Sequence, residues 1–331
     1  MGEKTKRKLF FGIILAVISV SVCAILSLVN TARLDKLTSG GYIKWVDYGV
    51  TAAAMNDALQ ADIETYGTEK HISWIDILSY LGAKYGGNFS SYKKSDIKSF
   101  TDKIKAGEET VQSISLKMKY FDYYKEAYSA VLDGYVGEYY KDGKFYYGLK
   151  AFSPIASGYY YEHYDDFGAS RSYGYKREHL GHDMMGSVGT PMIAVESGYV
   201  EAIGWNQYGG WRIGIRSFDN KRYYYYAHLR KDHPYTDIEE GDIITAGDVI
   251  GYLGMTGYSV KENVNNINIP HLHFGIQLIF DASQKDGNNQ IWIDTYEIVK
   301  FLYKNRMEVV KDTDSGEYRA ASEIIIYDIP D

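Results

Sequence analysis

Three short clusters of histidine are the residues of this sequence best suited to carry chemistry. They hold five of the eight histidines, in the stretches His179-Leu180-Gly181-His182-Asp183, Tyr226-Ala227-His228-Leu229 and Pro270-His271-Leu272-His273-Phe274. Imidazole nitrogens and a carboxylate suit zinc, and a catalytic zinc ion has three protein ligands and one open position. The clusters therefore predict a zinc site that can act on a bound water.

The elements around these clusters must bring their side chains to one point. The apolar residues around His271 and His273 predict a strand, in which residues two apart face the same way about 7 Å apart. One of the two would bind the metal and the other would stand beside its water, and the pattern leaves open which. Gly181, together with Gly186 and the Gly189-Thr190-Pro191 stretch that follow it, argues against a regular helix, so a bent loop must bring His179 and Asp183 together. If that stretch is extended, His182 points to the opposite side.

Other histidines and tyrosines near the clusters favour structural roles. A lone histidine in a half-buried strand is usually a hydrogen-bonded core residue, which is how we interpret His71, His163 and His233. Tyr224 and Tyr226 lie in the strand before His228, where each either helps to line a groove or packs in the sheet.

The region from about Tyr175 to Leu278 resembles the LytM-type zinc metallopeptidases, the M23 family, which cut peptide bonds in bacterial peptidoglycan. Besides the three histidine clusters, the resemblance rests on two glycine-containing motifs. They are G-T-P-x-x-A-x-x-x-G-x-V from Gly189 to Val200 and G-D-x-x-x-x-G-D-x-I-G from Gly241 to Gly251. The matching region covers about a third of the chain.

The resemblance implies a role for each site residue. His179, Asp183 and His273 would bind one Zn²⁺, and His228 and His271 would be the catalytic histidines. His271 would accept the proton of the water and His228 would donate a hydrogen bond to the developing oxyanion, or the two roles would be reversed. The implied fold is a twisted antiparallel sheet like the duplicated hybrid motif, with the site in a groove between loops.

Two departures from the family pattern bear on the groove. Residues 259–269 form a longer, asparagine-rich loop before the H-x-H strand, and Gly275 stands where an acidic residue is common. We expect these changes to affect groove shape and substrate choice rather than metal binding.

The N-terminus predicts a membrane anchor. Residues 9–29 form a run of 21 residues without a charge, which as a helix spans roughly 31 Å of hydrocarbon. Basic residues at positions 4 and 6–8 would keep the preceding end in the cytoplasm. We therefore expect a single-pass cell-membrane protein with an extracellular catalytic domain. A cleaved signal peptide is the alternative, and bulky Val22 argues against a lipoprotein signal at Cys23.

Composition excludes two classes of protein. The formal net charge is -7 and there is no long basic stripe, so a nucleic-acid partner is disfavoured. The chain has a single cysteine and therefore cannot be a disulfide-stapled scaffold.

The pattern along the 331 residues predicts an α+β protein in four parts. These are a cytoplasmic tail and transmembrane anchor (1–30), an extracellular helical domain of four or five helices (31–152), an antiparallel β metallopeptidase domain (153–310) and a peripheral C-terminal tail (311–331). Within the third part, short strands separated by glycine turns are followed by a return to helix between Ile291 and Arg306.

These observations predict a zinc-dependent endopeptidase of peptidoglycan, with a cell-envelope complex as a possible partner. One alternative is a non-hydrolytic scaffold or wall-binding protein with the same fold. Another is a second activity, glycan cleavage or sugar binding, in the helical domain. That domain contains carboxylates but no pair at a spacing typical of catalysis, which favours a structural or positioning role instead.

Overall fold

The computed structural model describes residues 48–172, 176–285 and 289–326, which belong to one compact unit. The apolar run at residues 9–29 lies outside these ranges. Among the residues that the structure describes, no helix combines the length and the apolar composition needed to cross a bilayer.

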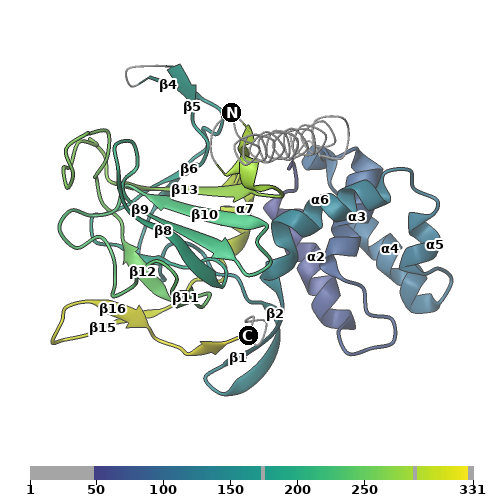
Figure 1. The fold of residues 1–331 in the computed structure, drawn as a ribbon. Coiled ribbons are helices and arrows are strands. Elements are labelled where there is room, and N and C mark those ends of the chain that lie inside the picture. The colour runs from purple at the N-terminus through teal and green to yellow at the C-terminus, as the bar shows by residue number, and fades with distance from the viewer. Residues whose placement is uncertain (1–47, 173–175, 286–288, 327–331) are drawn as a thin grey trace, which may run out of the picture. The chain divides into compact units, whose positions relative to one another are not determined.

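The first part of the described chain is helical, as the periodicity predicts (Figure 1). Its α-helices are α2 (Ala52–Thr65), α3 (Trp74–Tyr85), α4 (Lys94–Ala106), α5 (Val111–Ser115) and α6 (Phe121–Leu132). Their ends follow local chemistry. Ser73 caps α3 by accepting a hydrogen bond from the Asp76 backbone N–H, and Gly86 ends it in the left-handed conformation, with a φ of 64°.

The helical part ends earlier than the pattern predicts. After α6, residues expected to be helical form the hairpin of β1 (Val136–Lys141) and β2 (Lys144–Leu149). Asp142 and Gly143 supply the two positive φ angles of its tight turn, and aromatic residues on both strands favour the extended form.

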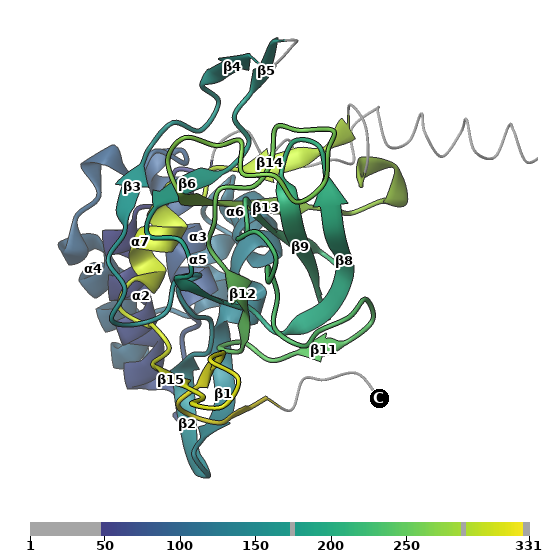
Figure 2. The same ribbon diagram turned by 90° about the vertical axis from the view of Figure 1, so that its left-hand side faces the viewer.

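An eight-stranded antiparallel sheet carries the histidine clusters (Figure 2). Its order is β11-β8-β9-β10-β13-β6-β3, with β14 paired to β13. The strands are β3 (Glu162–Tyr164), β6 (His182–Met185), β8 (Gly198–Asn206), β9 (Gly210–Ser217), β10 (Arg222–Ala227), β11 (Ile243–Ile244), β13 (His271–Leu278) and β14 (Ile291–Ile293). The prediction of an antiparallel β domain is confirmed.

Smaller elements surround this sheet. They are the pair β7 (Pro191–Ile193) and β12 (Val249–Tyr252), the hairpins β4 (Ser170–Ser172) with β5 (Lys176–Glu178) and β15 (Val309–Lys311) with β16 (Tyr318–Ala320), the helix α7 (Tyr296–Leu302), and the 3-10 turns η1 (Phe89–Ser91), η2 (Asp133–Tyr135) and η3 (Ala282–Gln284). The β4–β5 hairpin projects beyond the sheet in both views (Figures 1 and 2). The predicted closing helix is thus a short strand, β14, followed by α7.

The C-terminal segment is not peripheral, contrary to the prediction. β17 (Ile324–Ile325) adds to the β1–β2 hairpin by pairing with β1. Ile324 and Ile326 are buried in an apolar cluster with Phe152 and Met307. Three consecutive isoleucines, at positions 324–326, let the segment complete both a sheet and a small core.

A buried ionic network joins the helices to the sheet. The fully buried guanidinium of Arg222 on β10 forms two hydrogen bonds with the carboxylate of Glu196, at 2.7 and 2.9 Å. Its remaining nitrogen donates to the backbone oxygen of Ala130 in α6 at 2.9 Å. The strand that leads to His228 is therefore fixed to the last helix of the helical part.

Candidate metal centre and groove

The histidine clusters meet in a groove of about 1400 Å³ that lies along one face of the large sheet. Side chains alternate across a sheet, and antiparallel pairing puts Ala227 of β10 opposite His273 of β13. His271 and His273, two residues apart, therefore share the groove face, as the strand pattern predicts. His179 and Asp183 reach the same point from the loop before β6 and from β6 itself.

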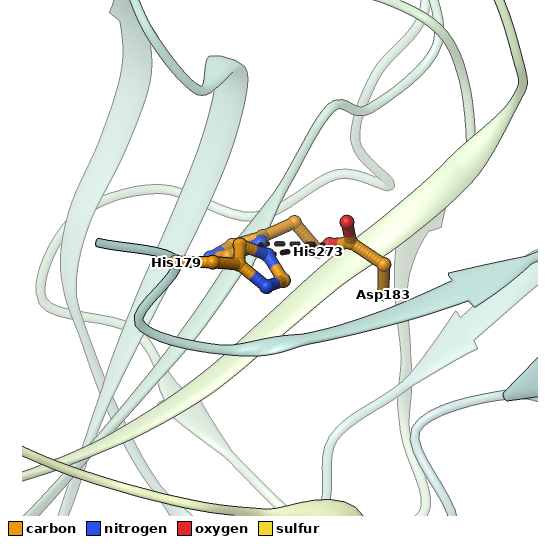
Figure 3. Close-up of side chains that lie close together, drawn as sticks. All are labelled: His179, Asp183 and His273. Atoms are coloured by element: carbon orange, nitrogen blue, oxygen red, sulfur yellow. Dashed lines mark hydrogen bonds and ion pairs between the residues drawn. The ribbon is translucent and has the colours of Figure 1, made fainter. Parts of the chain in front are cut away.

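Three atoms converge at the centre of the groove (Figure 3). Nε2 of His179 lies 3.0 Å from Oδ1 of Asp183 and 2.9 Å from Nδ1 of His273. The latter two atoms are 2.9 Å apart. A β-carbon at Gly181 would lie 2.5 Å from the His273 ring, so the glycine of the H-x-G-x-D motif makes room for that ring.

The three converging atoms fit a cation better than a set of hydrogen bonds. Burial acts to raise the pKa of Asp183, but the adjacent His179 and His273 rings outweigh it and lower the pKa, so the carboxyl group is ionised. Each ring nitrogen can carry one proton, and an ionised carboxylate carries no proton. At most two of the three contacts can therefore be linear hydrogen bonds. Two imidazoles and a carboxylate are also a donor set typical of catalytic zinc.

Two residues that the sequence did not point to surround this centre. Nδ1 of His179 lies 2.8 Å from Oδ1 of Asp166, off the line of the N–H bond, and 3.4 Å from the Asp166 backbone oxygen. The Arg171 guanidinium contacts Asp166 and lies 3.3 Å from Oδ2 of Asp183. With Asp166 beside Nδ1, the proton of neutral His179 sits there and Nε2 faces the centre. No motif spacing identified either residue, because both precede the H-x-G-x-D element.

The other two histidines of the clusters lie beside the converging atoms. The rings of His228 and His271 are 4.8 Å apart, and Nε2 of His271 lies 3.8 Å from Oδ1 of Asp183. Nδ1 of His228 donates to the Thr256 backbone oxygen at 2.9 Å, and Nδ1 of His271 to that of Ile269 at 2.8 Å. A carbonyl oxygen can only accept, so in each neutral ring Nε2 is the bare nitrogen and faces the groove. Burial, with help from nearby His271 and His273, lowers the pKa of His228.

Of the tyrosines of β10, Tyr223 and Tyr225 line the groove, whereas Tyr224 and Tyr226 are fully buried and pack in the sheet. Strict alternation along the strand, counted back from His228, would instead place Tyr226 and Tyr224 on the groove face. His228 has a φ of 65°, so the alternation of the strand does not continue through it.

The remaining histidines have structural contacts. His182 points away from the metal centre, and its Nε2 lies 2.9 Å from Nδ1 of His163. Nε2 of His71 lies 2.7 Å from Oδ1 of buried Asp62. These positions agree with the structural roles expected for His71 and His163, and with His182 facing the opposite side.

The departure at Gly275 has a steric cause. A β-carbon there would lie 2.7 Å from the indole ring of Trp292 and 3.1 Å from the Leu180 backbone oxygen. Trp292 of β14 thus occupies the space that a side chain at position 275 would fill, and it lines the groove itself.

Comparison with known families agrees with the motifs. Residues 177–290 match the model of Peptidase family M23. Residues 177–290 are therefore similar to the M23 peptidases. The predicted resemblance is confirmed for this region, which contains all five histidine-cluster positions assigned to the site: His179, Asp183, His228, His271 and His273.

Curated relatives of this region include an endopeptidase and lysostaphin. The domain is 40% identical over 110 residues to an L-Ala–D-Glu endopeptidase of Bacillus subtilis (strain 168), covering 33% of this chain and 32% of that protein. It is 38% identical over 97 residues to lysostaphin of Staphylococcus staphylolyticus, covering 29% of this chain and 18% of that protein. The chain thus spans about a third or less of the length of these two relatives.

A solved structure shares the fold over a longer range. It is a crystal structure of a Ruminococcus gnavus protein provisionally described as a glycyl-glycine endopeptidase, lytM. The two align with a TM-score of 0.56 and 22% identity, over 82% of this chain and 95% of that one. The shared fold therefore extends well beyond residues 177–290.

Proposed function

We propose that this protein is a zinc-dependent endopeptidase that cleaves peptide bonds in bacterial peptidoglycan. One observation carries the proposal: three ligand atoms converge to within 3.0 Å of one another, beside two further histidines, in a groove open to a peptide. The similarity of residues 177–290 to Peptidase family M23, and to an L-Ala–D-Glu endopeptidase and lysostaphin, supports the choice of substrate.

His179, Asp183 and His273 would hold the metal. A zinc ion bound there would supply an acidified water near neutral pH and would polarise the carbonyl oxygen of the cut bond. Asp166 and Arg171 then keep the ligand side chains in place, since each contacts a ligand from outside the triangle of ligand atoms.

The contacts of the two further histidines favour one order of roles over the other. Both rings present a bare Nε2 to the groove. Because burial lowers the pKa of His228, its ring gains a proton with difficulty and is a poor acceptor for the proton of the water. We therefore assign the acceptor role to the bare Nε2 of His271, which is the order first expected.

The setting of the enzyme is part of the proposal. We propose four parts, namely an anchor with its cytoplasmic tail (1–30), a helical domain (31–152), the peptidase domain (153–310) and a C-terminal tail (311–331). The anchor at residues 9–29 would place the catalytic domain outside the cell membrane, next to the wall. An envelope complex would be a fitting partner, because anchoring limits the enzyme to the wall layer it can reach.

Zinc content and wall digestion together test the function. We expect the purified protein to bind one zinc ion and to clear a peptidoglycan suspension. Asp183→Ala should lose both properties, whereas His271→Ala should keep the zinc and slow clearance by about 10²- to 10⁴-fold. If wild-type protein with one zinc bound leaves peptidoglycan intact, the alternative of a non-hydrolytic scaffold replaces this proposal.

A further inference from the structure

One cation in the groove has no partner for its charge within the described part of the chain. Among the described residues, three cationic side chains line the groove: Arg171, Arg212 and Lys285. Arg171 contacts the carboxylates of Asp166 and Asp183, and Lys285 that of Glu201. The guanidinium of Arg212 forms no ion pair or hydrogen bond with any described residue, and its buried Nη1 lacks an acceptor.

The register of the sheet places Arg212 on the same face as the metal centre. Its neighbour Ile213 pairs with Tyr226, so Arg212 lies beside Ala227, and Ala227 pairs with His273. Two strand spacings of about 4.8 Å separate the backbones of Arg212 and His273, or about 10 Å in all. An extended peptide rises about 3.3 Å per residue, so a group within about three residues of the cut bond can reach the guanidinium.

The surroundings of Arg212 favour an anion. Gly214 is the next residue after Arg212 on the groove face of β9. The Tyr223 hydroxyl lies over Gly214, because a β-carbon built there would be only 1.9 Å from the hydroxyl oxygen. The groove carboxylate of Glu162 belongs to β3, which lies on the far side of β13 from β9, and Glu178 directly precedes the metal-centre residue His179. A partly buried arginine with an open donor and a hydroxyl nearby is suited to bind a carboxylate.

We propose that Arg212 binds a carboxylate of the substrate, so that the enzyme selects peptidoglycan stem peptides with a free glutamate α-carboxylate near the cut bond. This inference rests on the proposed function. A glutamate linked through its side chain keeps its α-carboxylate free, whereas an oligoglycine bridge offers no side-chain charge. Burial of an unpaired cation disfavours the empty groove, and a carboxylate supplies the missing acceptor.

Binding to a catalytically slowed protein tests the inference apart from turnover. The probes are L-Ala–γ-D-Glu–L-Lys–D-Ala and its twin in which the glutamate carboxylate is a carboxamide, both amidated at the carboxyl terminus. We expect the zinc-loaded full chain carrying His271→Ala to bind the carboxylate peptide about 10- to 100-fold more tightly than its twin. Adding Arg212→Gln should reduce this preference to about 1, and Arg212→Lys should restore part of it.

A matched control separates recognition by Arg212 from the general field of the groove. Lys285→Gln removes the same charge from the same groove, but from a side chain that is already paired, so the preference should persist. Equal affinity for the two peptides, or a preference that survives Arg212→Gln, would overturn the inference. Arg212→Lys keeps the positive charge but removes the guanidinium. If the glutamine variant does not fold, a weaker preference for the carboxylate peptide in Arg212→Lys than in the parent protein still tests the role of the guanidinium.

The failure of this inference and the failure of the proposed function have different signatures. A wild-type enzyme that cleaves pentaglycine but not the stem peptide keeps the function and overturns the role of Arg212. A protein that shows the carboxylate preference but releases nothing from peptidoglycan supports the role of Arg212 and contradicts the proposed function.

Discussion

The buried pair of His182 and His163 should make this protein sensitive to acid. The His182 side chain is 1% exposed, and burial, with the charge of His163 adding to it, lowers the pKa of His182 to about 3. In the unfolded chain the pKa returns to about 6.5. Between these two values the unfolded state binds more protons, so stability is lost as the pH falls from about 6.5 towards 3.

The size of the effect follows from the two pKa values. At pH 4.5 the unfolded histidine is almost fully protonated and the folded one is not, so this residue alone lowers the free energy of unfolding by about 2.5 kcal/mol relative to pH 7. That figure is a large share of the stability of an ordinary domain.

His182→Gln removes the titrating group and keeps a side chain that can hydrogen-bond with His163. Urea unfolding of the wild type and the variant, each at pH 7.0 and pH 4.5 in the presence of a chelator, isolates the contribution. We expect the wild type to lose about 2.5 kcal/mol more than the variant between the two pH values. If both proteins lose the same stability, burial does not hold His182 neutral and the reasoning is refuted.

Three further changes test the contacts around the site. Asp166→Asn weakens the electrostatic hold on His179 and should reduce zinc affinity about 10- to 100-fold in a chelator competition, and an unchanged affinity would contradict the role of Asp166. Glu196→Gln leaves the buried Arg222 guanidinium with the Asp219 carboxylate alone, at 3.0 Å, and should lower the free energy of unfolding by about 3 kcal/mol, measured with urea, whereas a loss below about 1 kcal/mol would contradict the role of Glu196. Gly275→Asp should displace Trp292 and reduce the rate of wall digestion without loss of zinc, and full activity would show that the indole can move freely.

The sequence predicted the centre of the site because its chemistry lies in local patterns. Two-residue spacing in β13 puts His271 and His273 on one face, and the glycine between His179 and Asp183 permits the bend that joins them. The positions along the chain of the strands from β7 to β13 likewise follow from glycine turns and alternating residues, which act over short distances.

Features that depend on tertiary contacts were missed or wrongly expected. Asp166 comes close to His179 only in the folded chain, and no spacing in the sequence indicates that contact. The left-handed backbone at His228 shifts the strand parity, so Tyr223 rather than Tyr224 faces the groove. Ile324 forms a strand only because β1 offers a free edge far away in the sequence.

Mass spectrometry of digested peptidoglycan tests the central claim most directly. Purified wild-type protein, the same protein with a chelator, and His271→Ala would be incubated with intact peptidoglycan, and the released fragments sequenced. The account predicts new peptide amino termini at one type of bond with the wild type, and none with the chelator or, on the same timescale, with the variant. New glycan ends in place of peptide ends, or peptide ends that persist with the chelator, would contradict a zinc endopeptidase.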